Sequence, residues 1–97
     1  MKVRITAFRH NGKRLTDAEI ANQGPLEGEL ISAQVADKRG FYRRADLQAP
    51  KGSGLTDTLA TLFEPELMQI GENMLLLRGI EKRAGRAYLQ EWRCELI

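Results

Sequence analysis

A chain of 97 residues is long enough for one globular domain with its own core, and it leaves no room for a second. Its composition, 42% hydrophobic and 29% charged, is that of a folded protein and excludes the apolar-poor class of disordered chains. The net charge of +2 is too small to predict a nucleic acid or an anionic membrane as partner, so any such prediction depends on local clusters.

The first segment has the pattern of a half-buried strand. Val3, Ile5 and Ala7 alternate with polar residues, and Phe8 breaks the alternation as a β-bulge does. Asn11-Gly12 then forms a type I′ turn signal. The start lacks an uninterrupted apolar signal region, and the chain has no apolar run of about 18 residues. We therefore expect a soluble, cytoplasmic protein with no membrane partner.

A short helix is predicted next. Thr16 and Glu19 have capping-box spacing, in which each side chain accepts a hydrogen bond from the backbone of the other residue. This predicts a helix to about Asn22. The sequence Gln23-Gly24-Pro25 ends it, because glycine accepts the left-handed cap conformation and proline cannot continue a helix. A new strand is expected to begin near Leu26.

Residues 31–35 and 41–47 each alternate with a two-residue period around a turn at Asp37–Gly40, which predicts a second hairpin. Residues 49–54 contain a proline and two glycines and predict a mobile loop. Residues 55–63 fit both a helix and a strand, since their leucines recur at helical spacing whereas their threonines favour an extended chain.

The last third is predicted to be a β-meander. Residues 67–70 form a strand that turns at 71–73 into a long hairpin with a basic tip at Lys82–Arg86. Met74–Leu77 is apolar on both sides, which is typical of a central strand covered on both faces. Residues 88–96 alternate instead, so that strand has one face toward solvent.

Together these elements predict a mainly β fold. We expect a single domain over 1–97, built as a small antiparallel barrel or coiled meander of five to six strands with one or two short helices.

No residue pattern in the chain predicts an enzyme. The only cysteine, Cys94, excludes an internal disulfide and has the position of a core thiol, while the only histidine, His10, is expected to be an exposed turn residue. Residues 52–54 lack the lysine of a phosphate-binding loop, and Glu64 and Glu66 are expected to face solvent. We therefore expect no catalytic residue, metal site or cofactor, and we infer no small-molecule substrate.

One predicted function is nucleic-acid binding by a basic and aromatic hairpin. Basic side chains and an aromatic ring can combine phosphate contacts with base stacking. Tyr42 is expected to point outward for this purpose. Acidic residues on neighbouring strands would cancel the patch if they face the basic side chains. The candidate residues are Arg4, Lys38, Arg39, Tyr42, Arg43 and Arg44.

The other predicted function, which we place first, is that of a protein-interaction or assembly module with an unknown partner or a second copy. It rests on the strand that is apolar on both sides, since its second face must be covered either internally or by a partner. The candidate interface residues are Met68, Met74, Leu76 and Leu89.

Overall fold

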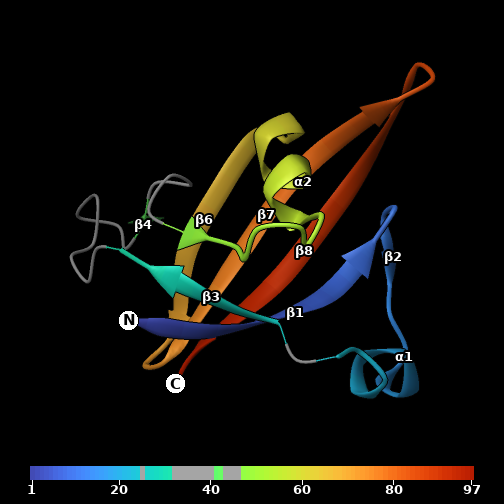
Figure 1. Cartoon of the computed structure of the whole chain (residues 1–97). Coiled ribbons are helices and arrows are strands. Elements are labelled where there is room, and N and C mark those ends of the chain that lie inside the picture. The colour runs from blue at the N-terminus through green and yellow to red at the C-terminus, as the bar shows by residue number, and fades with distance from the viewer. Residues whose placement is uncertain (25, 32–40, 43–46) are drawn as a thin grey trace.

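The computed structural model describes residues 1–24, 26–31, 41–42 and 47–97. In this part of the chain the strands form a curled antiparallel half-barrel with two short helices, so the predicted mainly β fold is confirmed (Figure 1). The strand order is β4-β6-β7-β8-β1-β3-β5, and β2 pairs with β1 outside this path. The elements are β1 (Lys2–His10), β2 (Lys13–Arg14), α1 (Asp17–Ala21), β3 (Glu27–Leu30), β4 (Phe41–Tyr42), β5 (Leu47–Gln48), α2 (Leu55–Thr61), β6 (Phe63–Gly71), β7 (Met74–Arg83) and β8 (Arg86–Leu96).

The long hairpin of β7 and β8 lies at the centre of the sheet. Its pairing continues from Met74 to the turn at Ala84-Gly85, where φ values of 50° and 76° fit a type I′ turn. Leu75 and Leu77 are 1% and 0% exposed on the face that packs against α2, which we call the inner face. Leu76 lies on the opposite, outer face. The predicted central position of this strand is confirmed, whereas its second face is covered only in part, because Met74 and Leu76 remain partly exposed.

The local features predicted for β1 are also present. Val3 and Ile5 are buried in the core. The pairing with β8 changes register after Ala7, which confirms the bulge predicted at Phe8. The turn at Asn11-Gly12 has positive φ at both residues and pairs β1 with β2.

α1 forms where its capping box predicts. The Thr16 hydroxyl accepts from the Glu19 N–H and the Glu19 carboxylate accepts from the Thr16 N–H, both at 3.1 Å. The helix is capped at Asn22 and has no buried residue, so it lies outside the core.

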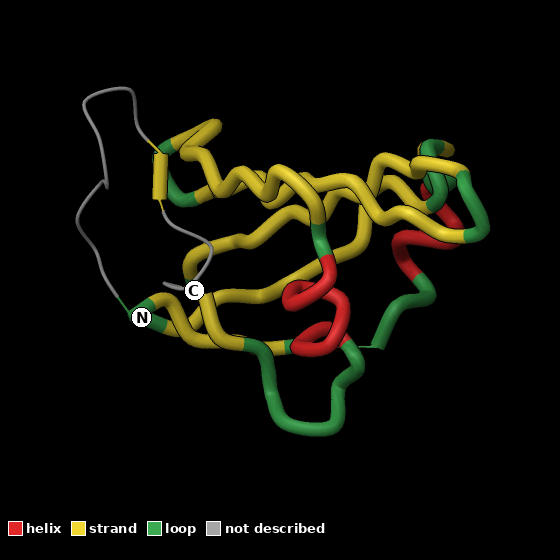
Figure 2. Tube along the Cα trace, turned by 90° about the horizontal axis from the view of Figure 1, so that it is seen from above, coloured by secondary structure: helices red, strands yellow, loops and turns green. Residues whose placement is uncertain are grey.

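Residues 55–61 are a helix, α2, which resolves the ambiguity of this segment. In a helix, Leu55, Leu59 and Leu62 all face the sheet and are 6%, 7% and 6% exposed. Their burial outweighs the extended preference of the threonines. Viewed from above, the strands bend rather than lie flat, with α2 beside them (Figure 2). Within the described residues, neither helix has the length and apolarity needed to cross a bilayer.

The predicted hairpin over residues 31–47 lies largely outside the described residues. β5 pairs with β3, as a hairpin requires, but β4 pairs with β6 at the other edge of the sheet. The β3–β5 register of Leu30 with Leu47 fits the predicted hairpin, and the segment that would pair with the other edge of Phe41 and Tyr42 lies outside the described residues, so that part stays a prediction. Tyr42 and Leu47 are five residues apart, so the two edges lie within about 17 Å of each other. A curled sheet makes this possible, and the local alternation of residues carries no information about it.

The core fills the space between the inner face and α2. It consists of aliphatic side chains together with one thiol, which is consistent with the predicted core position of Cys94. Its buried members are Val3, Ile5, Leu30, Leu47, Leu55, Leu59, Leu62, Leu67, Leu75, Leu77 and Cys94.

Candidate functional site

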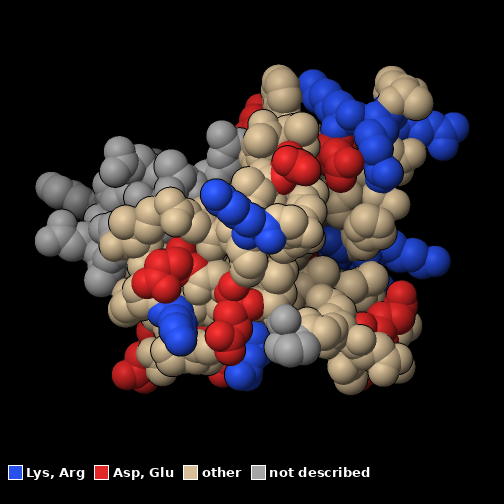
Figure 3. Space-filling view, viewed as in Figure 1, with Lys and Arg blue, Asp and Glu red and all other residues tan. Residues whose placement is uncertain are grey.

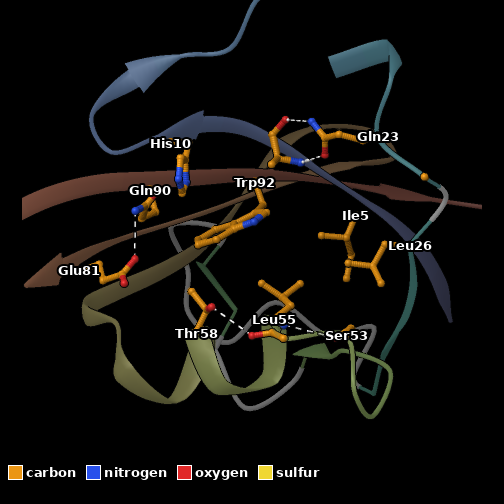
Figure 4. Close-up of a pocket in the computed structure, with 13 residues that line it drawn as sticks. Ile5, His10, Gln23, Leu26, Ser53, Leu55, Thr58, Glu81, Gln90 and Trp92 are labelled. Atoms are coloured by element: carbon orange, nitrogen blue, oxygen red, sulfur yellow. Dashed lines mark hydrogen bonds between the residues drawn. The ribbon is translucent and has the colours of Figure 1, made fainter. Parts of the chain in front are cut away.

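A pocket of about 400 Å³ lies on the inner face next to α2. Figure 4 shows the indole of Trp92 across its middle, with Gln90 and Glu81 on one side and Leu55 on the other. Three parts of the chain form the lining: the inner face of β1, β7 and β8, the connection between α1 and β3, and the loop that leads into α2. The lining residues are Ile5, Ala7, His10, Gln23, Gly24, Leu26, Ser53, Gly54, Leu55, Thr58, Glu81, Gln90 and Trp92.

Side-chain hydrogen bonds tie one of the two non-sheet walls to the sheet and shape the turn in the other. Gln23 accepts from the Ala7 N–H and donates to the Ala7 carbonyl, both at 2.8 Å, which fastens the connection after α1 to β1. In the loop before α2, the Ser53 hydroxyl accepts from the Leu55 N–H at 3.3 Å. The Thr58 hydroxyl donates to the Gly54 carbonyl at 3.1 Å. The wall formed by α2 is anchored separately, by the burial of Leu55 in the core.

One end of the pocket is a buried polar network centred on Gln90, which is 1% exposed. The side-chain oxygen of Gln90, Oε1, accepts from the backbone N–H of Asn11 at 3.0 Å. Its amide nitrogen donates to Asn11 Oδ1 and to Glu81 Oε2, each at 3.0 Å. The Gln90 amide thus joins the β1–β2 turn to β7, and this buried polar group is satisfied.

Glu81 brings a carboxylate to this end of the pocket. Gln90 donates to one of its oxygens, and the Arg83 Nε lies 3.4 Å from the other. The Arg83 guanidinium also donates to Asn11 Oδ1 and lies 4.9 Å from the centre of the Tyr88 ring. Arg83 is not among the pocket-lining residues, so it approaches Glu81 from the hairpin side.

His10 and Trp92 complete the lining at this end. His10 is exposed, as expected for a residue beside the turn, and it also lines the pocket. Trp92 lies opposite Leu77 and Ala7 on the inner face and is partly buried against the core.

Sequence reasoning missed this pocket, although one signal for it was present. On the inner face of β8, Tyr88, Trp92 and Cys94 alternate with the outward residues, and Gln90 is the polar exception in that series. A polar residue at a buried strand position requires hydrogen-bond partners. No sequence pattern identifies Asn11 and Glu81 as those partners.

The candidate interface residues do not all come together. Met68 lies directly opposite Leu76, and Met74 is two positions further along the same face of β7, so these three form what we call the outer apolar patch. All three are partly exposed. Leu89 pairs instead with Ile80, on the other side of a charged row.

That charged row crosses four strands of the outer face with alternating sign. Glu66 lies opposite Arg78, Arg78 opposite Glu91, and Glu91 opposite Arg9. The Arg9 Nε is 2.8 Å from the Glu91 carboxylate, and Glu91 is 8% exposed. The row therefore carries no excess charge.

The candidate nucleic-acid patch is only partly described. Arg4 lies opposite Glu27 and Glu95, with its guanidinium 3.9 Å from the Glu95 carboxylate, so acidic residues do face the basic first strand. The expectation that Tyr42 points outward is wrong, because it lies opposite the buried Leu67 and packs against the core. Lys38, Arg39, Arg43 and Arg44 lie outside the described residues. Nucleic-acid binding therefore stays a prediction.

Basic side chains also gather at the tip of the β7–β8 hairpin, at the upper right of Figure 3, and acidic side chains lie next to them. Two of these cations lie over aromatic rings. Lys82 Nζ is 3.9 Å from the centre of the Phe63 ring, and Arg83 lies over Tyr88. These contacts hold the basic side chains against the chain's own surface.

The reactive groups of the described residues offer little chemistry. Burial raises the pKa of the Cys94 thiol to about 12, so it stays protonated and unreactive at neutral pH. Within the described residues, no three His, Cys, Asp or Glu side chains are grouped closely enough to hold a metal ion. Glu64 and Glu66 are both exposed, as predicted.

Comparisons with known proteins assign the chain to no family. No family model matches it, and no curated protein or solved structure shows significant similarity to it.

Proposed function

We propose that the chain is a non-enzymatic protein-interaction or assembly module, with the outer apolar patch as its contact surface. The supporting observation is the pairing of Met68 with Leu76 on a face that neither described helix covers. α2 packs against the inner face, and α1 has no buried residue and lies beside the C-terminal half of β1, away from β6 and β7 (Figure 1). The patch is thus apolar surface that folding leaves partly exposed.

The charges around the patch favour a protein as the partner. On one side lies the alternating row of Glu66, Arg78, Glu91 and Arg9. On the other side Glu95 lies opposite Met74, with Arg4 next in line. Arg93, opposite Leu76, is held over the Phe8 ring, so the described rim has four basic and three acidic side chains. A surface of such mixed sign attracts a polyanion only weakly, whereas an apolar centre with a mixed polar rim is typical of protein interfaces.

Self-association is the form of this proposal that the isolated chain can test. The chain has three methionines, and two of them, Met68 and Met74, belong to the patch. Met1 is 48% exposed and serves as the internal reference. Hydrogen peroxide oxidises accessible methionines, and mass spectrometry locates the oxygen on each. We expect both patch methionines to become protected relative to Met1 as the protein concentration rises, in parallel with an increase in solution mass.

A matched pair of variants separates the patch from the rest of the surface. Leu76→Glu places a carboxylate in the patch opposite Arg93, which can pair with it and preserve the fold. Ile31→Glu makes the same kind of change at an apolar side chain that is 59% exposed just after β3, a strand that does not pair with β6 or β7. We expect only Leu76→Glu to abolish the protection and the mass increase. A single-chain mass and unchanged oxidation at every concentration would refute self-association.

A further inference from the structure

We propose that the inner-face pocket binds a small organic cation with an apolar body, whose charged group lies between the Glu81 carboxylate and the indole of Trp92. This site is separate from the outer apolar patch, because it lies on the opposite face of the sheet. The inference does not depend on the proposed interaction function.

The size and the construction of the pocket fit a small molecule. Its volume of about 400 Å³ falls within the range of known small-molecule sites, roughly 300–1,000 Å³. Gln23 fixes one wall to β1, and the buried Leu55 anchors the other wall in the core. A site with fixed walls does not have to order them when the ligand binds, which lowers the cost of binding.

The charge of the lining selects a cation. Among the described lining residues, Glu81 is the only Asp, Glu, Lys or Arg, and His10 is the only other titratable one. An anionic ligand would meet no lysine or arginine on these walls. The Glu81 carboxylate is held in place by Gln90 and Arg83, yet a carboxylate has about four lone-pair positions, so it can accept another donor.

Trp92 provides the second recognition element. Indole is the best side chain for binding a cation over its ring face. The rings of Phe8, Phe63 and Tyr88 each have an arginine or lysine over them, whereas no described lysine or arginine lies over Trp92. The lysines and arginines of the described part of the chain therefore do not occupy the face of this ring.

The opposite end of the pocket is apolar and would hold the hydrocarbon part of the ligand. Figure 4 shows Ile5, Leu26 and Leu55 on the far side of Trp92 from Glu81. A ligand with a charged group at one end and a compact hydrocarbon body therefore matches both ends. Because Glu81 already has two donors, we expect only a dissociation constant of about 1 mM for a simple probe.

The test uses fluorescence, because Trp92 is the only tryptophan in the chain and reports directly on its own surroundings. Three probes share one hydrocarbon ring and differ in charge: cyclohexylammonium, cyclohexanol and cyclohexanecarboxylate. Each is titrated into the wild-type chain at constant ionic strength. We expect a saturable change with the ammonium and at least about tenfold weaker binding of the alcohol and the carboxylate.

Matched variants assign the effect to Glu81. Glu81→Gln removes the charge and keeps an oxygen that accepts from Gln90, while Glu66→Gln makes the same change on the outer face. We expect Glu81→Gln to weaken ammonium binding at least about tenfold and Glu66→Gln to leave it unchanged. Equal binding of the ammonium and the alcohol by the wild type would overturn the proposal without any variant. So would the absence of a saturable response to the ammonium, or equal binding by the two variants.

Discussion

Replacing Gly28 with alanine tests the close packing of β3 against β5 and Ile5. A Cβ at this position would lie 2.5 Å from the backbone oxygen of Gln48 and 2.8 Å from Cδ1 of Ile5. The first contact is with the backbone, so β5 would have to move away from β3, with which it shares two paired positions among the described residues. The second would displace a core side chain that is 3% exposed.

Overpacking of this kind costs about 1–3 kcal/mol, and the backbone contact places Gly28→Ala at the upper end, at about 2–3 kcal/mol. In a domain of this size each kcal/mol lowers Tm by about 4–8 °C, so we expect a decrease of at least about 8 °C. Guanidinium and thermal unfolding, followed by the fluorescence of Trp92, measure both quantities.

Gly24→Ala is the matched control for this prediction. A Cβ at Gly24 has no other atom within 4 Å, and the residue does not have a positive φ. The same substitution there should change the free energy of unfolding by less than about 1 kcal/mol. If Gly28→Ala is as stable as Gly24→Ala, β5 does not lie against β3 and Ile5 in the way that the structure places it.

Three further predictions concern single side chains. Burial raises the pKa of Cys94 to about 12 from a usual 9.0, so the unfolded chain binds fewer protons than the folded one between these pH values. The free energy of unfolding should therefore fall as the pH rises through that window, and a constant value there would contradict the burial. Hydrogen bonds from the Thr16 backbone and side chain lower the pKa of Glu19 below 4.5. The ionised Glu19 therefore contributes its full stabilisation above pH 4.5 and loses it as the pH falls through its pKa in the folded chain. An NMR titration midpoint at or above 4.5 would refute this. Gln90→Leu should cost about 1–3 kcal/mol in urea unfolding, because it leaves the Asn11 N–H without its partner, and a neutral result would exclude the buried network.

The elements that could be predicted from the sequence are those fixed by neighbouring residues. Asn11-Gly12 specifies its own turn, because both positions need a positive φ and these residue types accept it. Thr16 and Glu19 specify α1 through a reciprocal pair of hydrogen bonds only three residues apart. The alternation in β7 and β8 predicts which side chains are buried, since the period of a strand is fixed.

The elements that could not be predicted depend on contacts distant in the sequence. α2 is a helix because Leu55, Leu59 and Leu62 meet a sheet surface formed by strands that come later in the chain. Tyr42 turns inward because β4 pairs with β6, and the pattern of residues 41–47 alone does not identify that neighbour. The outer apolar patch likewise depends on contacts that are distant in the sequence. Single apolar residues of the patch were predicted, but Leu89 was separated from the others only once the register was known.

The division of the inner face into core and pocket has a definite position, at Gly79. On one side of it lie Leu75 and Leu77, which are covered by the core. Leu62 packs directly over Gly79, with its Cβ 3.1 Å from where a side chain would begin. On the other side lies Glu81, which faces the pocket. The glycine thus lets the end of α2 close the core at this point.

This division separates the two proposed binding surfaces physically. Glu81 lies on the inner face beyond Gly79, whereas Leu76 lies on the outer face on the other side of that glycine. Substitutions at distant sites that share no partners have additive effects. We therefore expect Glu81→Gln to leave methionine protection unchanged and Leu76→Glu to leave the ammonium titration unchanged. A change in either cross-measurement would mean that the surfaces are coupled through β7, the strand that contributes a side chain to both.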